Sequence, residues 1–369
     1  MRIGIDARVL ERRMTGIGRY LSGILAGIKK FDSQNEYFLF TYNELADIDD
    51  FFSVIPTSNK IHVNKLYSSY WLRFILPAKI KENKIDVFFS PNNFLPNIKS
   101  NIKTIATIHD TVHKINKNFH PLSYRLYKDL MLPRTIKKSN IIITVSENSK
   151  QDLIKYYNID PNKVKAVHQY IDDKFDVHVE DDQHFSRVKE KYDLNNKPIL
   201  YMGAIENRKN IIGILKIADI VRNKIDNEFV LIGKKGYGFK NLYEQIKMRD
   251  NVRHIEYVDE EDIQYVYKTA SIFLFTSFYE GFGLPPLEAM KSGIPTLASN
   301  TSSLKEVIGS GGILFEPTQY EAFANEIMKL LNNSDYYNEV KQRGIKVAQK
   351  YNLENTAKKM VEIFNDLAY

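Results

Sequence analysis

Short runs of apolar, β-branched and aromatic residues recur along all 369 residues of the chain, and stretches with helical periodicity separate them. The runs are continuous rather than alternating, which indicates strands buried on both faces of a sheet. Strands that alternate with helices in this way predict an α/β protein built on doubly wound parallel sheets. The expected strands are Ile3–Ile5, Tyr37–Phe40, Val87–Phe89, Ile105–Ile108, Ile141–Val145, Val164–Val167, Ile199–Met202, Phe229–Ile232, His254–Val258, Ile272–Phe275 and Ile294–Ala298.

A polar, strand-free stretch near residues 172–196 interrupts this alternation. A chain of this length favours two domains, so we expect two Rossmann-like domains, residues 1–175 and 190–350, that face each other across a cleft. Open parallel sheets bind ligands at the carboxyl ends of their strands, which places the ligand in that cleft. The last helix, about residues 352–369, is amphipathic and has no strand to follow. We expect it to pack back on the first domain.

The composition excludes several classes of protein. The chain has no cysteine, so disulfide frameworks and zinc–thiolate sites are excluded. No stretch approaches the ~18 consecutive apolar residues of a membrane span, and the N-terminus is too poor in apolar residues for a signal peptide. We therefore expect a cytoplasmic protein. Residues 51–150 hold 16 basic and 5 acidic side chains, which indicates either an anionic partner for the first domain or a solvated basic surface.

The segment with the most candidate functional residues follows an expected buried strand. It reads Glu-Gly-Phe-Gly-Leu-Pro-Pro-Leu-Glu over residues 280–288. Glycines let the backbone pass close to a ligand, and Pro286 suits the first turn of a helix. A helix over residues 286–291 would present its N–H groups to a diphosphate. We expect Glu288 in the first turn of this helix, where it could accept two ribose hydroxyls, and Glu280 on the loop, where it could face a sugar.

Basic residues follow another expected strand, the one that ends at Met202. Arg208 offers a planar fork for phosphate oxygens and Lys209 a point charge. Two basic residues in a loop are common on any protein surface. The strand and Gly203 that precede them make phosphate binding the better interpretation.

The first half of the chain supplies fewer candidates. Gly16 and Gly18, within Met14–Tyr20, follow the first strand and open a helix, so their N–H groups could meet a diphosphate. The third glycine of a dinucleotide fingerprint is absent, because Leu21 stands there, and this disfavours nicotinamide binding. His109 ends an expected strand, where it could hydrogen-bond a sugar hydroxyl or merely cap the strand.

These segments resemble the retaining glycosyltransferases of family 4, which have the GT-B fold, and especially the mannosyl- and rhamnosyltransferase-like bacterial members of glycosyltransferase group 1. Residues 280–288 resemble the family's Glu-x7-Glu signature, and residues 201–210 its strand–Gly–Arg-Lys-Asn segment. The resemblance covers nearly all of residues 198–317. It implies catalytic roles for Glu280, His109, Arg208 and Lys209, and donor-binding roles for Gly16, Gly18, Gly203, Val258, Gly281, Phe282, Gly283, Leu284, Glu288 and Ser303.

The resemblance implies transfer of a hexose, mannose-like, from a nucleotide-sugar to a hydroxyl of a glycan or lipid-linked glycan. The configuration would be retained, and the product would belong to a bacterial surface polysaccharide such as O-antigen or capsule. GDP-mannose is the expected donor, with UDP- and dTDP-sugars as alternatives. The acceptor, a glycan or a polyprenyl-linked glycan, would bind the first domain.

The family's chemistry implies no cofactor and no metal site, and Asp47-Ile48-Asp49 is interpreted as solvated surface. Two alternatives from other classes stay open. One is a catalytically silent partner subunit that kept the fold, and the other is a nicotinamide-dependent oxidoreductase.

Two segments of the first domain, residues 65–79 and 124–134, mix aromatic with basic side chains. They could lie on the anionic inner face of the plasma membrane. They could equally be helices that cover the first sheet, with long side chains reaching to solvent. No motif supports a nucleic-acid partner.

Overall fold

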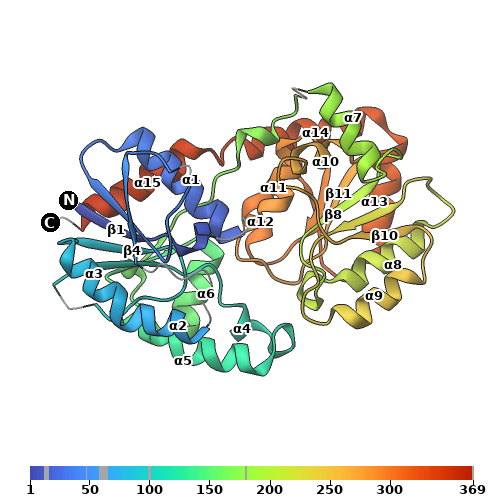
Figure 1. Ribbon diagram of the computed structural model, residues 1–369. Coiled ribbons are helices and arrows are strands. Elements are labelled where there is room, and N and C mark those ends of the chain that lie inside the picture. Colours follow the sequence, from blue (N-terminus) through green and yellow to red (C-terminus); the bar gives the residue numbers. More distant parts are fainter. Residues whose placement is uncertain (12–15, 47, 58–64, 99–100, 179–180, 368–369) are drawn as a thin grey trace. The chain divides into compact units, whose positions relative to one another are not determined.

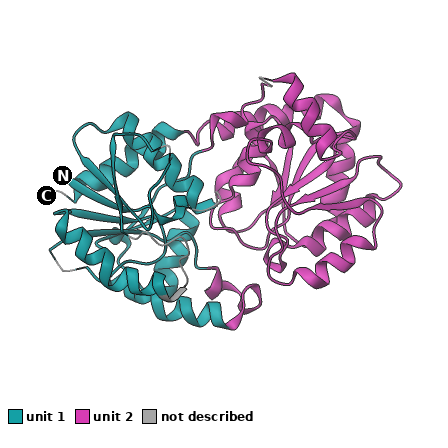
Figure 2. Cartoon of the chain, viewed as in Figure 1, with its two compact units in different colours: residues 1–111, 123–170, 353–369 teal, residues 112–122, 171–352 magenta. Residues whose placement is uncertain are grey.

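The structure is a computed structural model that describes residues 1–11, 16–46, 48–57, 65–98, 101–178 and 181–367 (Figure 1). Met14, Thr15 and Asp47, which belong to segments interpreted above, lie outside the described residues. The chain divides into two compact units (Figure 2). Unit 1 comprises residues 1–111, 123–170 and 353–369, and unit 2 comprises residues 112–122 and 171–352.

Unit 1 is built on a seven-stranded sheet with the order β3-β2-β1-β4-β5-β6-β7, and all its pairs are parallel. The chain winds outward from β1 to β3 and then returns past β1 to β4, so the direction of winding reverses between β1 and β4. The strands are β1 (Arg2–Asp6), β2 (Glu36–Thr41), β3 (Phe52–Pro56), β4 (Val87–Ser90), β5 (Lys103–Thr107), β6 (Ile141–Thr144) and β7 (Val164–Ala166).

The helices of unit 1 cover its sheet, and the last helix of the chain lies beside the first (Figure 1). At Gly27 the two helices approach so closely that an added Cβ would lie 2.3 Å from the Cβ of Ala357, so a side chain there would push them apart. The helices are α1 (Gly16–Phe31), α2 (Lys65–Tyr70), the π-helical η2 (Trp71–Ile75), α3 (Leu76–Glu82), α5 (Leu122–Lys138), α6 (Glu147–Tyr157) and α15 (Leu353–Asp366).

Unit 2 repeats the same winding on a six-stranded parallel sheet with the order β10-β9-β8-β11-β12-β13. The direction of winding reverses between β8 and β11. All four residues of β9 and of β11 are buried, as expected for strands covered by helices on both faces. The strands are β8 (Ile199–Met202), β9 (Phe229–Ile232), β10 (Val252–Ile255), β11 (Ile272–Phe275), β12 (Thr296–Ser299) and β13 (Ile313–Phe315).

One short segment of the first half belongs to unit 2. Val112 and Phe119 form an apolar cluster with Tyr279, and the Phe119 ring stacks on Phe278 at 6.2 Å. The division of the structure therefore differs from the expected single boundary at residue 175. The helices of unit 2 are α4 (Val112–Ile115), α7 (Asp182–Lys191), α8 (Ile211–Val221), α9 (Phe239–Lys247), α10 (Ile263–Thr269), α11 (Leu284–Lys291), α12 (Ser302–Ile308), α13 (Tyr320–Asn332) and α14 (Ser334–Ala348).

Most of the expected strands coincide with observed ones, and the differences lie mainly at sheet edges. The expected strand His254–Val258 is wrong in its bounds, because the observed strand β10 spans Val252–Ile255. Strands β3 and β13 were not predicted at all. Both are edge strands with half-buried residues, so they lack the continuous apolar run of a central strand, and β3 ends in a proline, which edge strands tolerate.

Candidate functional site

The reversal of winding in unit 2 brings two of the predicted loops together. Strands β8 and β11 pair directly, so the loops that follow them, residues 203–210 and 276–283, leave the same edge of the sheet. The Phe278 N–H donates to the Arg208 carbonyl at 3.0 Å, and Thr276 Oγ1 donates to the Asn210 carbonyl at 3.1 Å. A reversal point at the carboxyl ends of parallel strands is where open α/β sheets bind ligands.

Three of the predicted catalytic residues form one cluster of charges at this point. Lys209 Nζ lies 2.6 Å from Glu280 Oε1, and Arg208 Nη1 lies 3.1 Å from Glu280 Oε2. Arg208 Nη2 also donates to Glu206 Oε1 at 2.7 Å. Glu280 and Lys209 are buried. The sequence analysis did not single out Glu206, which balances the second positive charge.

The electrostatics of the cluster decide how Glu280 can act. Burial favours the neutral acid, but the attraction of Lys209 and Arg208 outweighs it and lowers the pKa of Glu280 to about 2. Burial lowers the pKa of Lys209, and the charge of Glu280 opposes that effect. Glu280 is therefore an ionised carboxylate at neutral pH, which accepts hydrogen bonds and cannot act as a general acid.

Gly203 stands at the carboxyl end of β8 with φ +154°. Its carbonyl oxygen would lie 1.9 Å from a Cβ added at Gly233, which ends β9 with φ +152°. The backbones after β8 and β9 thus approach more closely than any side chain at Gly233 would allow. The predicted binding residue Gly203 therefore shapes the loop that carries Arg208 and Lys209.

The helix after β11 corrects one expectation. Helix α11 begins at Leu284 rather than at Pro286, so Glu288 lies beyond the first turn and outside the reach of the favourable end of the helix dipole. Glu288 is nevertheless buried. The Tyr267 hydroxyl donates to Glu288 Oε2 at 2.7 Å, and this hydrogen bond stabilises the buried carboxylate.

Ser303 and Ser302 hold the glycine-rich loop in place. Ser303 Oγ lies 2.9 Å from the Glu280 carbonyl and 2.6 Å from the Phe282 carbonyl, and the Glu280 N–H donates to Ser302 Oγ at 2.9 Å. The remaining predicted residues of this loop directly follow Glu280 in the chain. Gly283, with φ +123°, lies just before α11. These loop residues are Gly281, Phe282, Gly283 and Leu284.

Val258, which the sequence analysis predicted to bind the donor, is buried in the loop that follows β10. Strand β10 lies two positions away from β8 in the strand order of the unit 2 sheet.

The predicted residues of unit 1 occupy strand and helix ends of that unit. Gly16 and Gly18 are the first and third residues of α1 and lie in its first turn. His109 follows β5, and its Nε2 donates to the Pro91 carbonyl at 2.9 Å, while its ring packs edge-on against Tyr20. Burial lowers the pKa of His109. The imidazole is therefore neutral at pH 7, with Nδ1 as an acceptor.

Comparison with known proteins agrees with this architecture. Residues 15–175 match the family described as Glycosyltransferase Family 4, and residues 182–347 match Glycosyl transferases group 1. The two matches together span most of the chain. It belongs to the group 1 glycosyltransferases. Its two parallel-sheet units make up the GT-B fold.

Relatives of this glycosyltransferase include named mannosyltransferases. O-antigen chain mannosyltransferase B of Escherichia coli is 28% identical over 77% of this chain and 75% of its own length. The serotype-specific mannosyltransferase WbdA of Escherichia coli is 26% identical over 72% of this chain, which spans only 34% of WbdA. Anabaena HepE, solved in complex with UDP and glucose, shares the fold with a TM-score of 0.72 at 15% identity, covering 99% of this chain and 100% of the HepE chain.

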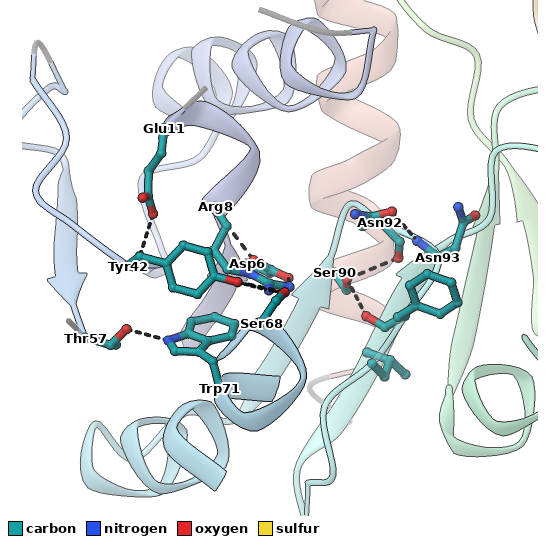
Figure 3. A network of polar contacts seen from close by, with 12 residues as sticks. Asp6, Arg8, Glu11, Tyr42, Thr57, Ser68, Trp71, Ser90, Asn92 and Asn93 are labelled. Atoms are coloured by element: carbon teal, nitrogen blue, oxygen red, sulfur yellow. Dashed lines mark hydrogen bonds and ion pairs between the residues drawn. The ribbon is translucent and has the colours of Figure 1, made fainter. Parts of the chain in front are cut away.

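The glycosyltransferase has a second polar cluster that the sequence analysis missed. It lies in unit 1, where the winding reverses between β1 and β4, and it centres on Asp6 and Arg8 (Figure 3). Arg8 Nη2 lies 2.6 Å from Asp6 Oδ2, and both side chains are largely buried. Charged residues at the end of the first strand were the available signal. Their importance depends on the strand order, which the sequence does not show.

Unit 2 of the glycosyltransferase also has a cavity of about 720 Å³. Its lining includes Lys197, Ser271 and Ile294, which precede β8, β11 and β12. It therefore lies at the amino ends of these strands, opposite the loops that carry Arg208 and Glu280.

Within the described ranges, no group of three or more His, Cys, Asp or Glu side chains is arranged to hold a metal ion. None of the helices in the described part of the chain combines the length and apolar character needed to cross a bilayer.

Proposed function

We propose that this glycosyltransferase moves a hexose from a nucleotide-sugar to a hydroxyl of a glycan, and that unit 2 holds the donor. The observation that carries the proposal is the cluster of Glu280, Arg208 and Lys209 at the reversal point of the unit 2 sheet. Arg208 and Lys209 lie beside a helix N-terminus, where diphosphate oxygens would replace Glu206 or Glu280 as partners of the two cations. The solved complex of HepE with UDP and glucose supports a nucleoside diphosphate as the donor's leaving group.

Each residue of the cluster takes a distinct role in this proposal. Arg208 and Lys209 stabilise the negative charge that develops on the departing diphosphate. Glu280, an ionised carboxylate, accepts hydrogen bonds from hydroxyls of the donor sugar. Glu288, oriented by Tyr267, accepts the ribose hydroxyls, because a carboxylate accepts hydrogen bonds through both of its oxygens.

We further propose that the reaction retains the configuration of the sugar. The bond between the anomeric carbon and the phosphate oxygen breaks, and the acceptor oxygen bonds to the anomeric carbon from the same face. The proton of the acceptor hydroxyl passes to the departing phosphate oxygen. The low pKa of Glu280 supports this route, because the carboxylate has no proton to give. Arg208 and Lys209 supply the positive charge in place of a metal ion.

The relatives favour mannose as the transferred sugar and a bacterial surface polysaccharide as the product. Two of them are named as mannosyltransferases, one of them of the O-antigen chain. GDP-mannose is the proposed donor, with UDP- and dTDP-sugars as the alternatives to be tested beside it. A glycan, either free or linked to a polyprenyl lipid, is the proposed acceptor.

An exposed apolar stripe on α5 supports peripheral contact with the anionic inner face of the plasma membrane. Leu122, Leu126 and Leu130 are spaced one helical turn apart and are 60%, 59% and 56% exposed. Arg134 and Lys137, near the end of the same helix, are also exposed. An apolar stripe with basic residues at one end fits an anionic bilayer surface.

Donor binding is the first experiment. GDP-mannose, UDP-glucose and dTDP-sugars are each added to the purified protein, and thermal unfolding and release of free sugar are measured. A donor at ~100 times its dissociation constant adds ~2.7 kcal/mol of stability. Arg208→Ala and Glu288→Ala should each abolish this protection, while the exposed control Arg222→Ala should keep it.

Unchanged protection in both site variants would overturn the donor site. Protection without sugar release or transfer would instead identify a catalytically silent partner subunit.

A further inference from the structure

A small cavity opens at the reversal point of the unit 1 sheet, beside β1 and β4. Its volume is about 180 Å³, below the ~300–1,000 Å³ of pockets that enclose drug-sized ligands. A cavity of this size suits a single small ring. Its lining includes Asp6, Arg8, Tyr42, Ser68, Asn92, Phe94 and Tyr127, and we call it the Arg8 pocket. All these residues belong to unit 1.

The charges in the Arg8 pocket cancel. Arg8 Nε and Nη2 donate to the two carboxylate oxygens of Asp6 at 2.7 and 2.6 Å (Figure 3). Arg8 Nη1 donates to the hydroxyls of Tyr42 and Ser68 at 2.7 and 3.2 Å. A guanidinium whose donors are mostly occupied and whose charge is neutralised has little attraction left for phosphate. The ligand chemistry that fits is therefore neutral and polar.

The mouth of the pocket presents aromatic surface and an amide. Tyr127 on α5 is 49% exposed and packs edge-on against Phe94 at 5.2 Å between ring centroids. The Asn92 side-chain carbonyl accepts from the Asn93 N–H at 2.9 Å, which orients the amide. In the described part of the chain the Asn92 NH2 group has no hydrogen-bond partner. Aromatic faces with a few oriented polar groups suit a sugar ring, whose C–H faces are apolar and whose edge is hydroxylated.

Contacts with neighbouring residues hold two parts of the pocket lining in place, Arg8 and the loop of Asn92 and Phe94. The Arg8 guanidinium lies 4.2 Å from the ring centroid of Trp71, the buried first residue of the π-helical turn η2. Turns of this rare kind are frequent at functional sites. On the other side, Ser90 Oγ donates to the carbonyls of Asn92 and Phe94 at 3.1 and 2.9 Å. The loop that carries the amide and one aromatic wall is thus fixed before any ligand arrives.

We propose that the Arg8 pocket binds one neutral sugar ring of the acceptor, stacked on Tyr127 and hydrogen-bonded by Asn92 and Ser68. The proposal rests on the glycosyl transfer proposed above and adds the place and the chemistry of acceptor recognition. Tyr127 also lies on the same helix as the apolar stripe of Leu122, Leu126 and Leu130. A lipid-linked glycan could therefore present its sugar to the pocket while its lipid stays in the bilayer.

The chain carries its own reporter for this pocket, because Trp71 is its single tryptophan. The whole protein is titrated with methyl α-mannoside, with an α-linked mannose disaccharide and with inorganic phosphate, and Trp71 emission is followed. We expect a saturable change with the sugars and none with phosphate. Tyr127→Ala should weaken sugar binding about tenfold, and Asn92→Ala should weaken it several-fold. Tyr156→Ala, which removes a half-exposed tyrosine of α6, should leave it unchanged.

No saturable response to either sugar, a response to phosphate, or equal affinity in the Tyr127→Ala and Tyr156→Ala proteins would overturn the proposal. Release of free sugar from the donor is measured in parallel on the same proteins. A protein that hydrolyses donor but gives no Trp71 response contradicts the Arg8 pocket alone. A protein that responds to sugar but neither binds nor hydrolyses any donor contradicts the transferase proposal instead.

Discussion

The two units wind their sheets in the same order and place charged residues at the same point of reversal, yet the two clusters differ. In unit 1 the pair of Asp6 and Arg8 comes from a single strand end, and its two charges satisfy each other. In unit 2 the cluster spans two loops, and Glu280 is shared by Arg208 and Lys209. The same topology thus supports a closed ion pair in one unit and, in the other, a network in which Arg208 and Lys209 pair with Glu206 and Glu280.

This difference underlies the two binding proposals. A closed pair with aromatic neighbours leaves a neutral cavity, which suits a sugar ring. A network that holds two cations beside the first turn of α11 can exchange a carboxylate partner for phosphate oxygens. Fold topology supplies the position of a site, and the side chains at that position decide its ligand.

The largest effect should come from Glu280→Gln. The substitution leaves the buried Lys209 and the half-buried Arg208 without their shared carboxylate, which should cost about 3 kcal/mol of unfolding free energy and strongly reduce sugar release from the donor. Urea denaturation and a donor hydrolysis assay measure both. The exposed control Glu321→Gln should behave as the parent. A Glu280→Gln protein of parental stability would show that the network is not formed.

The pair in unit 1 should respond differently from the network. Arg8→Met and Asp6→Leu should each lower stability by about 3 kcal/mol, because each leaves one buried charge alone. The double variant should be more stable than the sum of the single effects predicts, with a coupling of about 1–3 kcal/mol. In unit 2, Glu280→Gln with Lys209→Met should recover less, because Arg208 then keeps only one of its two carboxylate partners, Glu206. Equal recovery in both units would remove the distinction between pair and network.

Lowering the pH should remove the stability that the ion pairs of Glu280 contribute. Its folded-state pKa is lowered to about 2, so its contribution is fully present above the unfolded-state pKa near 4.5 and is lost as the pH falls towards 2. The contribution amounts to about 3 kcal/mol. The melting temperatures of the parent and of Glu280→Gln should therefore differ most at pH 6–7, approach each other below about pH 4.5 and converge only near pH 2. A gap that stays constant with pH would contradict the ion pairing.

A smaller effect is expected at the edge of the donor site. Tyr267→Phe removes the hydroxyl that donates to Glu288, and hydrogen bonds to charged groups contribute about 1.5–3 kcal/mol. The variant should lose stability within this range and bind the donor more weakly, as thermal protection by GDP-mannose would show. Tyr336→Phe, which removes a hydroxyl bonded to the half-buried Glu326, is the control and should keep its donor affinity.

The smallest effect on stability should come from the stripe on α5. Leu126→Ser changes an exposed residue, so stability should stay within about 0.5 kcal/mol of the parent. Binding to vesicles that contain anionic lipid should nevertheless fall, as a sedimentation assay would detect. Met248→Ser, an exposed apolar residue of unit 2, provides the matched control. Equal vesicle binding by both variants would rule out the stripe as the contact surface.

Much of the fold could be predicted because central strands such as β9 and β11 are short, continuous apolar runs. The edge strands β3 and β13 could not, since half-buried residues leave no such run. The start of α11 was misplaced because the two prolines suggested a start at Pro286, whereas the helix begins at Leu284. The candidate donor residues Arg208, Lys209 and Glu280 could be named from the resemblance. Their mutual ion pairing could not.

The sequence by itself determined the α/β class, the alternation of strands and helices, and the chemical nature of the residues in each loop. These are local properties, carried by apolar runs, glycines and prolines close together in the chain. Only the tertiary structure decided which loops become neighbours. Parallel pairing of β8 with β11 joins Lys209 to Glu280, and the folding of η2 against the end of β1 places Trp71 on Arg8. These contacts join segments more than 60 residues apart, and they depend on the order in which the strands pair and the helices pack, which local sequence patterns do not specify.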